Sequence, residues 1–158
     1  MKKYFFLLFI VGLGILQVTL LDGFRFFSVR PDFLLIAVVI ASLTFDLRTA
    51  LLLCAFAGIF KDLFGATGFG FNTVLFTTWS FLIIQLSRLI PLDEMLMQAG
   101  LVLIVAFLHN LVTGFYMLSL GSIIPFGIFL RILILETLLT ALFFPLLAKL
   151  QTRVSLKS

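Results

Sequence analysis

Long apolar runs alternate with short polar segments along the chain. The runs are continuous rather than alternating with a period of two, which favours helices over strands. The second run is short for a bilayer-spanning helix, which needs about 20 apolar residues, and we expect Leu47 to extend it. The pattern therefore predicts an all-α, single-domain, polytopic membrane protein. Its six transmembrane helices are expected at residues 4–21, 33–47, 49–64, 71–87, 95–118 and 126–150.

Composition supports a membrane location and excludes several classes of function. Of the 158 residues, 63% are hydrophobic and only 11% are charged, which is too few charges to cover a soluble domain. We attribute the net charge of +4 to membrane topology, and we expect no nucleic-acid partner. The single cysteine, Cys54, lies in an apolar run and indicates neither an intramolecular disulfide nor a metal site.

The basic residues predict the orientation of the chain. The first run resembles a signal peptide, but no small-residue cleavage pattern precedes Asp22, so we expect an uncleaved first helix. Six spans place both termini on one side of the membrane. If that side is the cytoplasm, basic residues concentrate inside, as the positive-inside rule requires. The inner set is Lys2, Lys3, Arg48, Arg88, Lys149, Arg153 and Lys157, and the outer set is Arg25, Arg30 and Lys61.

Small residues recur at helical spacing in the second and third runs. Ala37 and Ala41 are four residues apart. Ala50, Cys54 and Gly58 follow the same spacing, so each set lies on one face of its helix. Such faces allow membrane helices to approach closely. We expect both faces to bind helices of partner proteins.

Charged residues gather on the expected outer side, where the second run begins and the third run ends. Pro31 suits the first turn of a helix, and Asp32 would meet the positive end of that helix. At the end of the third run, Lys61 is close enough in the expected topology to pair with Asp32. Its neighbour Asp62 could pair with Arg30 in the same way. Structural ion pairing and a functional outer site both remain open.

A glycine-rich segment follows these charges and leads into the fourth run. Its glycines most simply supply turn conformations. It contains no phosphate-binding loop of the GxxxxGK[ST] type, so nucleotide binding is not indicated. Together with the charged residues it forms the expected outer polar rim, which comprises Arg30, Pro31, Asp32, Lys61, Asp62, Gly65, Gly68, Gly70 and Asn72.

Four polar or charged residues interrupt the last two runs. Arg131 and Glu136 are five residues apart and do not face each other well on a helix. Glu136 needs another partner near mid-depth, where His109 or Asn110 lies at a comparable depth. Interhelical hydrogen bonding and a proton relay both remain open. A lone histidine is a poor metal site, and no nucleophile–base pair is recognisable, so we expect no metal, cofactor or catalytic residue.

In length, span order and two loose motifs, the chain resembles the family of the rod shape-determining protein MreD. Lys61 departs from the family pattern, in which an apolar residue is expected before the aspartate. The matching residues are Arg30, Pro31 and Asp32 before the second run, then Gly58, Asp62, Gly65 or Ala66, Gly70 and Asn72.

This resemblance implies a non-enzymatic scaffold of the bacterial elongation machinery in the inner membrane. Besides the lipid bilayer, the expected partner is a single-span protein of the MreC type. Through it the chain would connect MreB filaments with the peptidoglycan synthase RodA and its class B penicillin-binding protein. The family is also similar in architecture to the substrate-binding subunits of energy-coupling-factor vitamin transporters, which is the alternative. Their small-residue docking face is usually on the first helix, where this chain has only Gly12 and Gly14.

Overall fold

The computed structural model describes residues 3–19, 31–65, 68–92, 94–122 and 125–155, which form six helices. The prediction of an all-α chain with six helices is therefore confirmed. Four of the helices begin at the predicted residue, because a polar turn or a glycine precedes each long apolar run. The helices are α1 (Lys3–Thr19), α2 (Phe33–Thr44), α3 (Leu47–Phe64), α4 (Phe71–Leu89), α5 (Met95–Ser119) and α6 (Phe126–Ser155).

Within the described residues, α5 and residues 127–151 of α6 are long and apolar enough to cross a membrane. The apolar helices α1 and α2 are shorter, with 17 and 12 residues. At 1.5 Å per residue, α2 is about 18 Å long, well below the roughly 30 Å of a hydrocarbon core. The six expected spans thus correspond to two long candidates and four shorter helices.

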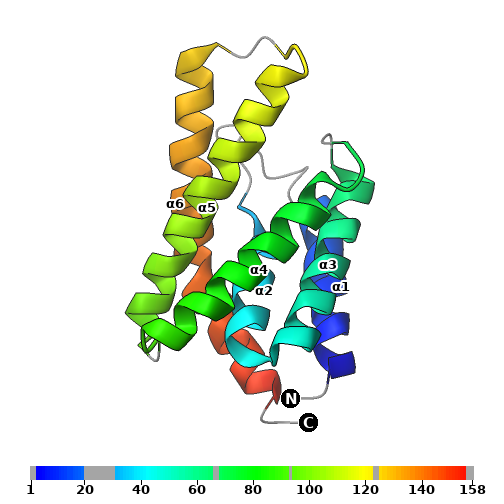
Figure 1. The fold of residues 1–158 in the computed structure, drawn as a ribbon, viewed down its shortest axis with the longest axis vertical. Coiled ribbons are helices and arrows are strands. Elements are labelled where there is room, and N and C mark those ends of the chain that lie inside the picture. Colours follow the sequence, from blue (N-terminus) through cyan, green and yellow to red (C-terminus); the bar gives the residue numbers. More distant parts are fainter. Residues whose placement is uncertain (1–2, 20–30, 66–67, 93, 123–124, 156–158) are drawn as a thin grey trace.

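Helix α2 lies at the centre of the bundle. Each residue from Phe33 to Ser42 is buried, so the helix has no exposed face over most of its length. A helix that is hydrophobic all round is typical of a buried element. The other five helices all pack against it (Figure 1). Because α2 is enclosed by protein, its short length does not have to match the thickness of a bilayer.

A tight turn ends α2 earlier than predicted. Leu47 is the first residue of α3 and does not extend α2. The carboxylate of Asp46 caps α3, accepting from Thr49 Oγ1 at 2.9 Å and from the Thr49 backbone N–H at 3.4 Å. The hydrogen bond from the Thr49 side chain is the main cause that holds the pKa of Asp46 below its ordinary value. This cap favours a new helix over another turn of α2.

The small-residue faces of α2 and α3 pack inside the chain. At Gly58, α3 approaches α4 so closely that a Cβ would lie 2.4 Å from Thr73 Cα. These faces therefore bring helices of the same chain together, and they do not form the free surface for partner helices that the sequence predicted. Small residues permit close helix contact, and this property serves contacts within the chain as readily as contacts with a partner. The remaining members of the two faces are buried: Ala37, Ala41, Ala50 and Cys54.

Helices α5 and α6 form an antiparallel hairpin that contacts the other four helices mainly through α2 (Figure 1). The connected ends of the hairpin extend beyond α1–α4 at one end of the molecule. At the opposite end, α1 begins and α6 ends. Arg48 at the start of α3 and Arg88 at the end of α4 belong to this same end, as expected if it faces the cytoplasm.

We predict that Gly58→Ala destabilises the fold, because the added methyl group would meet the backbone of Thr73 at 2.4 Å. Overpacking of this kind should lower the free energy of unfolding by about 1–3 kcal/mol. Chemical unfolding in detergent micelles measures the change. The matched control is Gly100→Ala in α5, where no atom lies within 4 Å of the added Cβ. It should leave the helix as stable or more stable, and equal losses from both substitutions would contradict the packing described.

Candidate functional site

Asp32 lies at the N-terminus of α2, where three other helices reach it. Its Oδ1 accepts from the Leu35 backbone N–H at 3.1 Å and so caps α2. The same oxygen lies 3.5 Å from Gln17 Nε2 on α1. The backbone N–H of Asp32 donates to Thr140 Oγ1 on α6 at 3.0 Å. Its Oδ2 forms an ion pair with the ammonium of Lys61 on α3. One buried aspartate thereby joins α1, α3 and α6 to α2.

Lys61 extends this cluster to His109 on α5. Its Nζ lies 3.1 Å from His109 Nε2, and it sits 5.0 Å from the centre of the Phe76 ring. An ammonium donates hydrogen bonds and cannot accept them. In the neutral form of the His109 ring, Nε2 therefore accepts from Lys61, which leaves the ring proton on Nδ1. The predicted pairing of Lys61 with Asp32 is formed, but Asp32 is only 2% exposed and does not lie on an exposed rim.

Asp62 has a separate role, which is to fix the start of α4. Its Oδ1 accepts from the backbone N–H and from Nδ2 of Asn72, both at 2.9 Å. Its Oδ2 accepts from the backbone N–H groups of Gly70 and Thr73 at 3.0 Å and from Thr73 Oγ1 at 2.7 Å. Gly70, the N-cap position of α4, has a φ of 94° and no side chain that could cap the helix. The carboxylate of Asp62 supplies that cap from α3.

The remaining members of the expected outer rim have different environments. Pro31 is buried beside Asp32, whereas Gly65 and Gly68 are exposed. Arg30 lies outside the described residues, and so does its predicted pairing with Asp62. The structure thus divides the expected rim into an Asp32–Lys61 pair, which His109 of α5 joins, and a buried Asp62 cap.

The polar residues of α5 and α6 face one another only in part. Asn110 Nδ2 lies 3.5 Å from Thr137 Oγ1, which forms an interhelical contact within the hairpin. His109 faces Lys61 and Asp32 of α3 and α2. Glu136 and His109 line the same cavity. Arg131 is exposed on α6.

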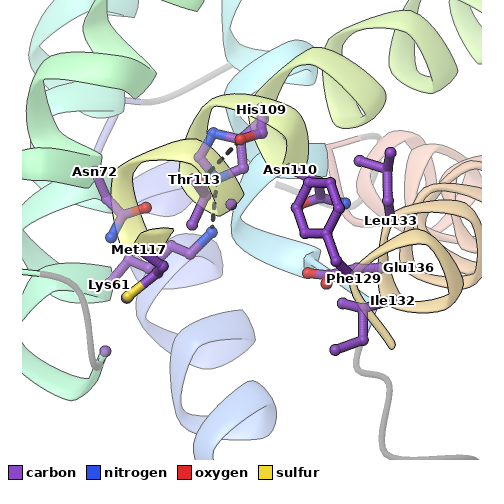
Figure 2. A pocket seen from close by; sticks show the side chains of 12 residues that line it. Lys61, Asn72, His109, Asn110, Thr113, Met117, Phe129, Ile132, Leu133 and Glu136 are labelled. Atoms are coloured by element: carbon purple, nitrogen blue, oxygen red, sulfur yellow. Dashed lines mark hydrogen bonds between the residues drawn. The ribbon is translucent and has the colours of Figure 1, made fainter. Parts of the chain in front are cut away.

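A cavity of about 270 Å³ separates the α5–α6 hairpin from α3 and α4 beside the Lys61–His109 contact (Figure 2). Lys61 and His109 lie on one side of it, and the residues of α6 lie on the other (Figure 2). A second cavity of about 190 Å³ between α1 and α3 is also lined by Lys61. The first cavity is lined by Lys61, Gly65, Asn72, His109, Asn110, Thr113, Gly114, Met117, Phe129, Ile132, Leu133 and Glu136.

Sequence reasoning missed several polar residues that complete these sites. Gln17 and Thr140 contact Asp32, and Thr73 contacts Asp62. Ser42 of α2 donates to Ser80 of α4 at 2.9 Å, which adds another buried link. Gln17 and Thr140 are single polar residues in apolar runs, and this isolation is the signal that predicts a buried partner. The identity of the partner depends on contacts between distant segments.

Comparison of the chain with protein-family models, with curated proteins and with solved structures gives no match. The site is therefore interpreted from its own geometry. Among the described residues, no three His, Cys, Asp or Glu side chains lie close enough together to hold a metal ion. The arrangement consists of two buried carboxylates engaged within the chain and a polar-walled cavity next to one of them.

We predict strong coupling between Asp32 and Lys61. Lys61→Met leaves the buried carboxylate without its cation and should lower the free energy of unfolding by about 3–5 kcal/mol. Adding Asp32→Asn removes the uncompensated charge and should restore part of that loss. A double-mutant cycle, measured by chemical unfolding in detergent micelles, gives the coupling energy. Purely additive effects of the two substitutions would show that the pair contributes nothing.

Asp62→Asn should destabilise the chain by about 1–3 kcal/mol, because an amide NH₂ would face N–H donors that now have an acceptor. Asp46→Asn is a control with the same chemical change at an exposed cap, where asparagine also functions well. Its melting temperature should stay near that of the unmodified protein. If both variants melt alike, Asp62 does not have the capping role described.

Proposed function

We propose that the chain is a non-enzymatic membrane scaffold of the bacterial cell-elongation machinery, as its resemblance to the MreD family implies. The observation that best supports this proposal is the use of the motif residues inside the fold. Asp32 joins four helices to one another, and Asp62 caps α4 from α3. Gly58 permits the close contact of α3 with α4. Carboxylates that are fully engaged in this way support a rigid framework rather than a reaction.

A scaffold in the bilayer needs outer helix faces that can contact other transmembrane helices. The α5–α6 hairpin offers large exposed apolar residues on both helices, and this supports docking of a single-span partner of the MreC type. We further propose a multi-pass protein of the inner membrane with both termini in the cytoplasm. The exposed residues of the hairpin include Ile104, Phe107, Phe115, Ile128, Ile134 and Leu138.

A second candidate is the substrate-binding subunit of an energy-coupling-factor vitamin transporter. The observation that favours it is the cavity of about 270 Å³ beside Lys61, which approaches the size of small-molecule pockets. Such a subunit would dock to a transmembrane coupling protein that works with a pair of ATPases. The two candidates therefore differ in the proteins that accompany the chain.

Affinity purification from native membranes in mild detergent, followed by mass spectrometry, tests the proposal. We expect a stoichiometric single-span protein with a periplasmic coiled coil, together with RodA and a class B penicillin-binding protein. A multi-pass protein of unrelated sequence with the same tag is the control for nonspecific recovery. Recovery of a coupling protein with paired ATPases instead would overturn the scaffold proposal.

A further inference from the structure

Helix α4 has an outer face that no other part of the described chain covers. The buried residues of α4 lie on one side of the helix and pack toward α2 and α3, which are its main neighbours (Figure 1). Exposed residues on the other side are spaced four, three and four positions apart, so they form one stripe along the helix. This stripe, the α4 face, consists of Val74, Thr78, Phe81 and Gln85.

Gln85 is the residue of the α4 face whose side chain makes no hydrogen bond within the described part of the chain. The other polar residue, Thr78, donates its hydroxyl proton to the Val74 carbonyl at 2.8 Å on its own helix. A carboxamide has two N–H donors and an oxygen that accepts two hydrogen bonds. The donors and the acceptor of Gln85 are therefore open to whatever lies against α4.

The depth of Gln85 makes this a costly arrangement if α4 lies in a bilayer. The helix runs from Phe71 to Leu89, so its midpoint is Ser80. Gln85 is five residues further, about 7.5 Å along the axis, whereas a hydrocarbon core extends about 15 Å to each side of its middle. An unpaired carboxamide at this depth is unfavourable and favours contact with a polar group of another helix. This step rests on the proposed membrane location and not on the scaffold role.

Membrane orientation and symmetry favour a second copy of the chain as that partner. Copies of one chain insert with the same orientation, so a two-fold axis that relates two of them runs along the membrane normal. A residue close to this axis then meets its own counterpart at the same depth. A charged residue would repel its counterpart there. Because a carboxamide both donates and accepts, two Gln85 side chains instead complement each other and form a reciprocal pair.

We propose that the chain forms a symmetric dimer through the α4 face, in which the Gln85 side chains of the two copies hydrogen-bond to each other. Phe81 and Leu82, which are 44% and 48% exposed, supply apolar contact beside this pair. A single asparagine between the helices favours dimers in a comparable way in parallel coiled coils. The α5–α6 hairpin takes no part in this contact and stays available for the single-span partner.

Energy transfer between copies labelled with a donor or an acceptor at the C-terminus, mixed in liposomes, tests the inference. We expect transfer that rises with the protein-to-lipid ratio and reaches a plateau, as a monomer–dimer equilibrium requires. Gln85→Leu keeps the apolar surface but removes the pair, and should raise the dissociation constant at least about fivefold. Gln85→Asn retains a carboxamide and should lie closer to the unmodified protein. No transfer by the unmodified protein, or an equal dissociation constant in Gln85→Leu, would overturn the inference.

Disulfide formation locates the contact on α4. In a Cys54→Ser background, Phe81→Cys places a thiol on the α4 face and leaves Gln85 unchanged, so oxidation in liposomes should link two copies. The matched control is Leu142→Cys, at a 71% exposed position of α6, which should remain monomeric. Linkage of Leu142→Cys but not of Phe81→Cys would overturn the inference.

Extraction of the membranes with alkaline carbonate separates this inference from the proposal on which it rests. Release of the protein would contradict the membrane location, and with it the dimer. Retention of a protein that stays monomeric in liposomes would contradict the dimer alone.

Discussion

The carboxylate of Asp32 is the constraint on which the arrangement of helices depends. It lies at the end of a helix that is buried on all sides, and a buried charge is costly unless it is paired and hydrogen-bonded. Lys61 supplies the countercharge, and Gln17 a hydrogen bond from α1. Thr140 accepts from the backbone of the same residue. The hydrogen bonds and the ion pair of this one residue thus position α1, α3 and α6 around α2. Lys61 also contacts His109 and so connects α5 to the cluster.

The contact between α3 and α4 depends on two features, a glycine that permits close approach and a carboxylate that caps α4. Gly58 removes the side chain where the two backbones meet, and Asp62 then reaches the first amides of α4. The cap depends on the close approach, because the carboxylate of Asp62 reaches these amides only when the two helices are close. Among the described residues, the α5–α6 hairpin meets α3 and α4 through side chains such as Lys61 and His109, and the cavity lies beside that contact.

The sequence predicts the helices well, because long apolar runs broken by polar turns leave few alternatives. It also indicates the pairing of Lys61 with Asp32, as one of two plausible ion pairs beside that of Arg30 with Asp62, because these charges lie at one depth. It does not reveal that α2 is central, because a lipid-facing helix and a buried one are equally apolar. For the same reason, the sequence does not distinguish small-residue faces that pack within the chain from faces that bind partner helices. Depth alone leaves both His109 and Asn110 as possible partners of Glu136, whereas the structure shows the side chain of His109 next to Lys61.

The central claim is that Asp32 holds the surrounding helices closed around α2, and the single cysteine is a natural probe of it. Cys54 is 1% exposed, with its Sγ 3.7 Å from the Val38 carbonyl of α2. The decisive measurement is the rate at which a maleimide labels Cys54 in the unmodified protein and in Asp32→Ala, in the same detergent. We expect very slow labelling in the unmodified protein and a rate at least about tenfold higher in Asp32→Ala, which reflects easier opening of the bundle. Rapid labelling of the unmodified protein, or equal rates in both, would contradict the account.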